Sequence, residues 1–387
     1  MPELAILSPI LPAAPLVGGT IHIVGAARQL ARAYELRFYA LTNPPAPPIL
    51  PALADVCACV STYPRTPTRG LSLDPPAVRM EHSTPLIDAL ERDWARHAPA
   101  IVQFEFTTMM RYAPLARRFG ARVICTAHNV AFLAQIRRAR HEHAPHLRAR
   151  RWIGALSLWR YELAALRQCD LVVTHSTADA AALRRWLPKT PIEYVPSGVE
   201  LDAQQPCFDP RAENEVLFVG SYHHPPNLEG ARWLAREVWP IVRRTHPHAR
   251  LTLAGRAPPP TIQALAALDI HVPGTLADLR PLYARASLMV APIFWGSGVR
   301  IKILDALAYG LPLVTTALAA EDIALVPGDS ALFAEQPAEF AAAIARLLDD
   351  AALRARLGAA GRMIVERDYD WEQIGARLAS LYAGMLQ

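Results

Sequence analysis

Lysine is nearly absent from this sequence: Lys189 and Lys302 are its only two lysines, and arginine carries the rest of the basic charge. No apolar run approaches the roughly 18 residues that a membrane-spanning helix needs. The first residues, MPELAILSPI, also lack the basic start and the long apolar stretch of a secretory signal. These absences predict a protein of the cytoplasm.

Cysteine is scarce, and its spacing excludes the common structural roles. The five cysteines are Cys57, Cys59, Cys125, Cys169 and Cys207. Their number is odd, and the Cys57-x-Cys59 pair has no second pair that would complete a metal site. We therefore expect the cysteines to be small buried residues of a protein in a reducing compartment. The sequence therefore does not predict a metal site formed by these cysteines.

The rest of the composition is that of a globular protein. Of the 387 residues, 52% are hydrophobic and 19% are charged, which is enough apolar material for two domains of ordinary size. The formal net charge is +5. This mild excess favours anionic ligands or an acidic membrane surface, but it is far below the basic character expected of a nucleic-acid-binding protein.

Short apolar runs alternate with stretches of helical periodicity along the whole chain, which is the pattern of a parallel sheet covered by helices. Segment 196–214 is polar, contains prolines and has no periodicity, so it is the expected linker. The sequence thus predicts one α/β domain over residues 1–195 and a second over 215–368. Segment 369–387 carries an apolar stripe and is expected to be a helix that packs back across the junction. Expected helices in the second half include 227–245 and 261–268.

One apolar run, which begins at Val290, breaks at the turn GSG and restarts as a charged helix near Arg300. Backbone N–H groups are unpaired at a helix N-terminus and the helix dipole is positive there, so phosphate is a natural ligand. Lys302 and Asp305 lie about 60° apart around such a helix, and a carboxylate there can accept two hydroxyl hydrogen bonds from a ribose. The alternative is a capped helix with a solvated Lys302–Asp305 pair, worth only about 0.3 kcal/mol.

A family resemblance is carried by the order and spacing of these segments. The second half resembles the donor-binding domain of a retaining, GT-B-fold glycosyltransferase of family 4 (glycosyl transferases group 1), and the first half resembles the same family more loosely. The segments of the second half are FVGSYHHPPNLEGARWL, PHARLTLAGR and IHVPGTLADLRPLYARASLMVAPIFWGSGVRIKILDALAYGLPLVTT. Those of the first half are the glycine pair Gly18-Gly19, IVQFEFTTMMRY, TAHNV, LVVTHSTAD and VPSGVELD.

The resemblance implies a fold and a reaction. The fold is α/β, with two Rossmann-like doubly wound domains that face each other across a cleft and a C-terminal helix that returns to the first domain. The reaction is the transfer of a sugar from a UDP- or GDP-linked donor to a glycan, lipid-linked or small-molecule acceptor, with retention and without a metal. The components are therefore a nucleotide-sugar co-substrate and an acceptor, and no nucleic acid.

The resemblance also implies roles for residues of the second half. Arg256 and Lys302 would neutralise the diphosphate, and Asp305 would hold the ribose. The remaining donor-binding positions are Gly220 and Ser221 in the turn after the first strand, Gly274 and Thr275 near the base, and Gly296, Ser297, Gly298 and Arg300 around the diphosphate.

The family pattern contains a pair of glutamates here, and this chain departs from it at both positions. Asp305 stands at the second, one methylene shorter but still able to accept two hydrogen bonds. Ser297 stands at the first, where many members place a glutamate against the transferred sugar.

In the first half, Gly18 and Gly19 would approach the donor phosphate, and His128 would face the sugar and the acceptor. Glu105 ends an apolar strand, where it could contact the acceptor or be a paired strand-end carboxylate. For His128 the alternative is an ordinary structural histidine.

The most basic run extends from Arg137 to Trp152. It offers a peripheral contact with anionic headgroups at the inner face of a membrane, or with a lipid-diphosphate acceptor. A solvated helical face is the alternative.

Two competing functions share the architecture. A sugar-nucleotide 2-epimerase needs carboxylates poised around the second carbon of the sugar, and Ser297 argues against this. A non-catalytic nucleotide-sugar-binding protein is the other alternative, motivated by the same substitution.

Overall fold

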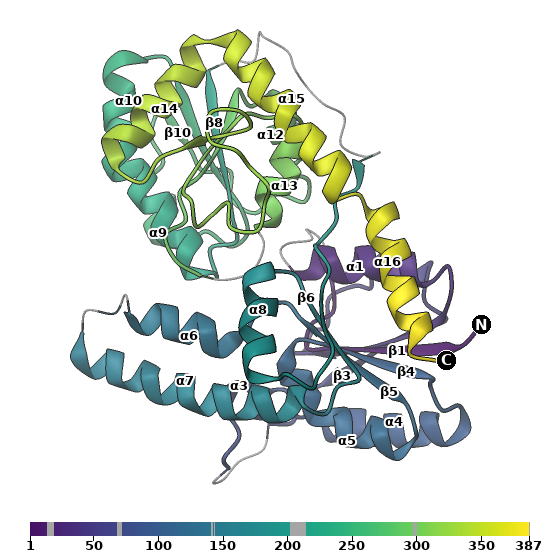
Figure 1. Ribbon diagram of the computed structural model, residues 1–387. Helices are drawn as coiled ribbons and strands as arrows, with labels where there is room; N and C mark the ends of the chain where they lie inside the picture. The colour runs from purple at the N-terminus through teal and green to yellow at the C-terminus, as the bar shows by residue number, and fades with distance from the viewer. Residues whose placement is uncertain are drawn as a thin grey trace. The chain divides into compact units, whose positions relative to one another are not determined.

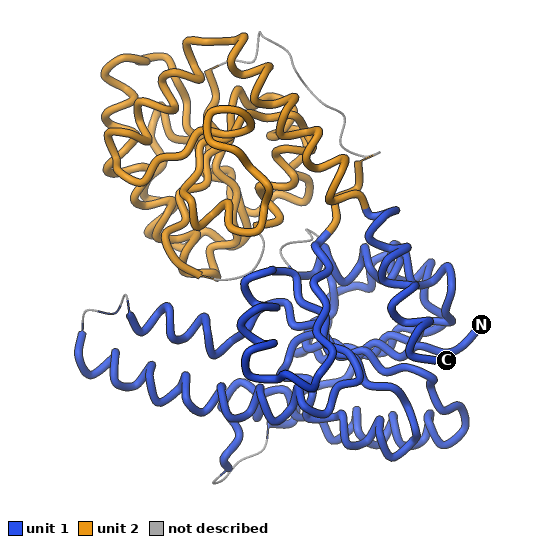
Figure 2. Tube along the Cα trace, viewed as in Figure 1, with its two compact units in different colours: residues 1–197, 371–387 blue, residues 198–370 orange. Residues whose placement is uncertain are grey.

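The computed structural model describes residues 1–13, 19–67, 72–140, 142, 144–201, 214–296 and 300–386. It divides into two compact units, shown in Figures 1 and 2. Unit 1 contains Met1–Ser197 and Trp371–Gln387, and unit 2 contains Gly198–Asp370. Most of the expected linker, residues 202–213, lies outside the described residues.

Unit 1 is built on a seven-stranded sheet in the order β3-β2-β1-β4-β5-β6-β7, with every pairing parallel. Because β1 pairs with both β2 and β4, the direction of strand addition reverses between β1 and β4. In parallel sheets, ligands bind at such a switch point, beyond the carboxyl ends of the strands. The strands are β1 (Glu3–Ser8), β2 (Glu35–Thr42), β3 (Cys59–Pro64), β4 (Ile101–Glu105), β5 (Arg122–Ala127), β6 (Leu171–Thr174) and β7 (Ile192–Tyr194).

Helices cover the sheet of unit 1, and α6 and α7 lie side by side and project from it as a pair (Figure 1). Serine side chains cap the N-termini of two of the helices. Ser83 accepts a hydrogen bond from the N–H of Leu86, and Ser176 accepts one from the N–H of Asp179. The helices are α1 (Gly19–Leu30), α2 (Pro51–Ala54), α3 (Pro76–Met80), α4 (Thr84–Arg96), α5 (Ala113–Arg118), α6 (Ala131–Arg140), α7 (Pro145–Leu166), α8 (Thr177–Trp186) and α16 (Trp371–Gly384), with a 3-10 helix, η1 (Thr107–Tyr112).

The C-terminal helix α16 belongs to unit 1 although it follows unit 2 in the chain. Its stripe of Trp371, Ile374, Leu378 and Tyr382 is buried in the same apolar cluster as β1 and α1. A Cβ added at Gly25 of α1 would lie 2.2 Å from the Trp371 ring, so only glycine permits this close approach. The expected return of the C-terminal helix to the first domain is confirmed.

Unit 2 repeats the design with six parallel strands in the order β10-β9-β8-β11-β12-β13. Here the reversal lies between β8 and β11. The strands are β8 (Glu215–Val219), β9 (Arg250–Ala254), β10 (Ile270–His271), β11 (Leu288–Ala291), β12 (Leu313–Thr315) and β13 (Leu332–Phe333). The helical segments are α9 (Pro225–Trp233), the π-helix η3 (Leu234–Val238), α10 (Trp239–Thr245), α11 (Pro260–Gln263), α12 (Arg280–Arg285), α13 (Ile301–Ala308), α14 (Pro337–Asp349) and α15 (Ala351–Asp368).

Two expected helices of unit 2 differ from the observed ones. The helix expected over 227–245 is interrupted by the π-helical turn η3. The helix expected over 261–268 ends at Gln263, because the backbone turns at Ala267 and Ile270, which exchange hydrogen bonds before β10. That expectation was wrong because apolar spacing over so short a segment does not distinguish a helix from a turn.

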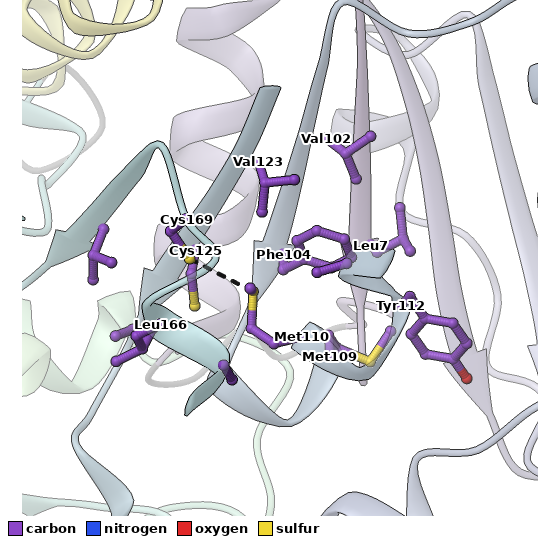
Figure 3. Packing of buried hydrophobic residues seen from close by; sticks show 14 of the residues in the cluster. Leu7, Val102, Phe104, Met109, Met110, Tyr112, Val123, Cys125, Leu166 and Cys169 are labelled. Atoms are coloured by element: carbon purple, nitrogen blue, oxygen red, sulfur yellow. Dashed lines mark hydrogen bonds between the residues drawn. The ribbon is translucent and has the colours of Figure 1, made fainter. Parts of the chain in front are cut away.

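The core of unit 1 explains part of the cysteine content. Figure 3 shows Cys125 and Cys169 among buried side chains of β4, β5, η1 and α7, with the Cys169 sulfur 3.9 Å from that of Met110. Both cysteines are buried, as expected, whereas Cys57 is half-buried and Cys59 is exposed. All four are free thiols, and Cys207 lies outside the described residues.

Candidate functional site

Glycine turns lie at the carboxyl ends of four adjacent strands of unit 2. Gly220 follows β8, Gly255 follows β9, Gly274 follows β10 and Gly296 follows β11. The described donor-binding positions that were predicted in unit 2 therefore lie in or beside the loops at the carboxyl ends of neighbouring strands, around the switch point of this sheet. Ser297 and Gly298 lie outside the described residues, as does Gly18 of unit 1.

The turns after β8 and β9 are packed backbone to backbone. The N–H of Gly220 donates to the carbonyl of Ala254 at 3.1 Å. A Cβ added at Gly255 would lie 1.7 Å from the carbonyl oxygen of Gly220, and Gly255 has φ +150°. Only glycine fits here, for both steric and conformational reasons.

Lys302 is anchored to the turn after β8. Its Nζ donates to the Oδ1 of Asn227 at 2.7 Å, and the Asn227 amide donates to the carbonyl of Ser221 at 2.9 Å. The amine also lies 4.7 Å from the centre of the Phe218 ring. Burial, and then the nearby Arg300, lowers the pKa of Lys302 to about 7. An anion bound here would favour the charged amine and raise that pKa again.

The loops after β9, β10 and β11 hold the other predicted residues. A Cβ at Gly296, which has φ +124°, would lie 3.3 Å from Nη2 of Arg300, so the guanidinium lies against this turn. The Thr275 hydroxyl accepts from the N–H of Ala257 at 2.9 Å and ties the β10 loop to the residue after Arg256. The Arg256 side chain is exposed. Arg256 therefore lies at the carboxyl end of β9 as a surface residue, and its role at the diphosphate stays a prediction.

Asp305 lies on the same helix as Lys302 and is half-buried. Close to it is a pair of buried tyrosines, Tyr283 and Tyr309, whose rings stack at 5.2 Å with 6° between their planes. Burial, and then the Asp305 charge, raises the pKa of Tyr309 to about 12 and that of Tyr283 well above its ordinary value. The sequence does not predict the tyrosine pair, because Tyr283 of α12 and Tyr309 after α13 are distant in the chain.

Glu105 and His128 form one group in unit 1. Glu105 ends β4 and His128 directly follows β5, the neighbouring strand. Glu105 Oε2 lies 2.6 Å from Nε2 of His128. The other oxygen of Glu105 accepts from the Gln103 amide at 2.5 Å, and the Gln103 carbonyl accepts from the Tyr382 hydroxyl of α16 at 2.8 Å. Glu105 is thus a paired strand-end carboxylate. Its partner is His128, which was also a candidate site residue from the sequence.

The second nitrogen of His128 faces the beginning of α1. A Cβ added at Gly19 would lie 3.0 Å from His128 Nδ1 and 3.2 Å from the Phe106 ring. Phe106 has a positive φ of 67°, and its ring stacks on His128 at 4.1 Å between centroids. Non-glycine residues adopt this backbone conformation rarely, and it occurs more often at functional sites.

Two further histidines, which were not predicted from the sequence, complete this group. The ring of His22, from α1, lies 3.8 Å from that of His175, and both lie within 5.6 Å of His128. Burial lowers the pKa of His175 to about 3 and that of His22 well below its ordinary value, so both imidazoles stay neutral at physiological pH. His175 follows the strand LVVT as His128 follows ICTA, and this parallel could have revealed it.

The described part of the chain holds no group of three or more His, Cys, Asp or Glu arranged to bind a metal ion. Among the helices of the described ranges, none combines the length and apolar character required to cross a bilayer.

Comparisons with known proteins give related matches for both halves. The family described as "Glycosyltransferase Family 4" matches residues 17–203, and "Glycosyl transferases group 1" matches residues 213–350. A phosphatidyl-myo-inositol mannosyltransferase of Mycobacterium leprae is 31% identical over 51% of the chain and 56% of that protein. An MMP alpha-(1->4)-mannosyltransferase of Mycolicibacterium hassiacum is 27% identical over 60% of the chain and 58% of that protein. The alignments span less than two thirds of these curated relatives.

Solved structures match over the whole chain. A sucrose-phosphate synthase from Thermosynechococcus elongatus has a TM-score of 0.78 at 19% identity, covering 99% of each chain. HepE of Anabaena, in complex with UDP-glucose, has a TM-score of 0.68 at 12% identity, covering 99% of this chain and 100% of that one. Likeness at these identities shows that the fold is shared.

Proposed function

Because this chain belongs to the glycosyltransferases, with a family 4 first half and a group 1 second half, we propose that it transfers a sugar from a UDP- or GDP-linked donor to a glycan, lipid-linked or small-molecule acceptor, with retention of configuration. The observation that carries this proposal is the Lys302–Asn227 contact beside the Gly220-Ser221 turn. It holds the Lys302 amine, which a bound anion would keep charged, at the carboxyl edge where a phosphate would meet glycine backbone.

On the donor side, negative charge builds on the diphosphate as it leaves the sugar. Preorganised positive groups stabilise that charge most effectively in a water-poor site. Lys302 supplies one such group, the exposed Arg256 supplies a second, and the half-buried Arg300 supplies a third at the same edge. As the family resemblance implies, the proposed reaction uses no metal, and these groups would supply the stabilising charge. HepE, which has been crystallised with UDP and with UDP-glucose, supports a nucleotide-sugar donor.

On the sugar and acceptor side, the working group is His128 with Glu105. Glu105 fixes the ring by accepting a hydrogen bond from Nε2–H, which leaves Nδ1 directed toward Gly19. His128 can then contact a sugar or acceptor hydroxyl through Nδ1. The neutral His22 and His175 beside it add no competing positive charge at neutral pH.

A transfer assay tests this proposal. The protein is incubated with radiolabelled UDP- or GDP-sugars and with glycan or lipid-linked acceptors, and label is followed into product. Label that moves to the acceptor is the expected result. A changed sugar without any acceptor would instead indicate an epimerase, and binding without either reaction would indicate a non-catalytic protein.

We further propose that the helix pair α6 and α7 makes a peripheral contact with an anionic membrane. On α7, Trp152, Ile153 and Leu156 are 44%, 72% and 59% exposed. These positions share one face of a helix at about 100° per residue. Arg148 and Arg150 lie one turn away and are also exposed. An exposed apolar face flanked by arginine is the pattern of a helix that lies in the headgroup layer, and it supports localisation at the inner face of a membrane.

Co-sedimentation with vesicles tests the membrane contact. The protein is expected to bind vesicles that contain phosphatidylglycerol and not vesicles of phosphatidylcholine alone. Ile153→Ser with Leu156→Ser should weaken binding about tenfold or more, because apolar area no longer enters the bilayer. Leu268→Ser is the matched control, since Leu268 is a fully exposed leucine of unit 2. Equal binding by both variants would support a solvated face instead.

A further inference from the structure

Glu162 is a fully buried carboxylate on α7 that the proposed reaction does not use. One of its oxygens accepts from the Thr107 hydroxyl at 2.7 Å and from the N–H of Ala131 at 3.2 Å. The other accepts from the N–H of Phe132 at 2.8 Å. All three donors belong to segments that follow strand ends of the sheet.

These donors are close in sequence to Glu105 and His128, which contact each other at the candidate site. Thr107 follows Glu105 by two residues, and Ala131 follows His128 by three. Phe106, between Glu105 and Thr107, holds the positive φ and stacks on the His128 ring. A single carboxylate thus ties down both chain segments whose relative position sets the contact between Glu105 and His128.

The hydrogen-bond donors that Glu162 contacts are of a kind that favours a carboxylate. Ala131 and Phe132 begin α6, where backbone N–H groups have no partner within the helix and the dipole favours negative charge. Glu162 satisfies two of these groups from another helix, and Thr107 adds a third hydrogen bond. Burial nevertheless raises the pKa of the Glu162 carboxyl to about 7, because water does not stabilise its charged form there. Such a group costs stability by itself, and a positional role would explain its presence.

We infer that Glu162 is a positioning residue, which fixes His128 against Glu105 by clamping Thr107 and the first two amides of α6. The inference rests on the proposed function for its effect on rate, but the placement of His128 can be measured without activity. In the described part of the chain, the hydrogen-bond partners of the Glu162 carboxylate are Thr107, Ala131 and Phe132, all of unit 1. Its loss should therefore lower kcat and leave the KM for the donor nearly unchanged.

Glu162→Gln is the first test, because glutamine keeps the shape but turns an NH2 group toward N–H donors. We expect kcat to fall about 10- to 100-fold, the size of effect that a displacement of about 1 Å of a reacting group produces. The His128 resonance in spectra of protein labelled with carbon-13 histidine should move as well. Glu91→Gln is the control, since Glu91 is an exposed carboxylate of the same unit that pairs with Arg118.

Thr107 provides a milder second test if Glu162→Gln fails to fold. Thr107→Val removes one of the three hydrogen bonds and should lower kcat by several-fold, and Thr107→Ser should restore most of the loss. A kcat within threefold of the wild type for both Glu162→Gln and Thr107→Val, with His128 unmoved in the spectra, would overturn the inference. If the wild type transfers no sugar from any donor, the proposed function fails instead, and the His128 spectra still decide whether Glu162 positions the ring.

Discussion

Lys302→Met is expected to lower kcat/KM for the nucleotide-sugar donor by about 100- to 1,000-fold, the loss that follows removal of one preorganised charge from a transition state. Methionine keeps the apolar stem over Phe218 but removes the amine that Asn227 holds beside the Gly220-Ser221 turn. The fold should survive, because the buried lysine is replaced by an apolar residue of similar length. Donor kinetics and a thermal unfolding curve give the two readouts.

The natural control is Lys189→Met, because Lys189 is exposed and is the only other lysine. It should leave donor kinetics unchanged. A Lys302→Met variant with wild-type kcat/KM would show that the diphosphate does not bind beside α13.

The same lysine should make donor binding depend on pH. In the free protein its pKa is lowered to about 7, and the diphosphate should raise it. Below pH 7 the amine is already charged, whereas above pH 7 binding requires proton uptake, so affinity should fall as pH rises. The two lysines give two side-chain signals in protein labelled with carbon-13 lysine. The signal that is absent from Lys302→Met should titrate near 7 in the free protein and at higher pH with UDP or GDP bound.

Gly255→Ala should prevent unit 2 from folding, or destabilise it by more than about 4 kcal/mol, which is exceptional for a single substitution. The added Cβ would lie 1.7 Å from the Gly220 carbonyl oxygen, and the backbone φ of +150° strains any residue with a side chain. Gly220 and Gly255 directly follow the paired strands β8 and β9, so neither residue can move away without separating these strands. Urea unfolding followed by circular dichroism measures the effect.

Gly328→Ala is the matched control for backbone strain. Gly328 also has a positive φ, +82°, but nothing lies within 4 Å of an added Cβ. It should cost only about 1–2 kcal/mol, the cost of a left-handed conformation alone. Equal unfolding midpoints for the two variants would contradict the close approach of the β8 and β9 turns.

Much of the fold was accessible from the sequence, because it depends on local pattern. The alternation of apolar runs and helical periodicity predicted two doubly wound domains, and the segment GSGVRIKILD predicted a glycine turn followed by a helix. In that helix Ile301, Leu304 and Ala308 are buried, and Gly310 after it has φ +70°, as a helix-ending glycine requires. Their positions at the polar ends of apolar runs also identified Glu105 and His128 as candidate site residues. The contact between them was not predicted.

The sequence by itself determined which residues end strands and begin helices, since steric preference and hydrophobic period act between near neighbours along the chain. Only the tertiary structure decided which of those ends meet. Asn227 holds Lys302 from another helix, His22 and His175 surround His128, and Glu162 caps a helix that begins far from it in sequence. Each of these contacts depends on strand order and helix packing, which no local pattern encodes, because the packing energy is shared among many residues distant in sequence.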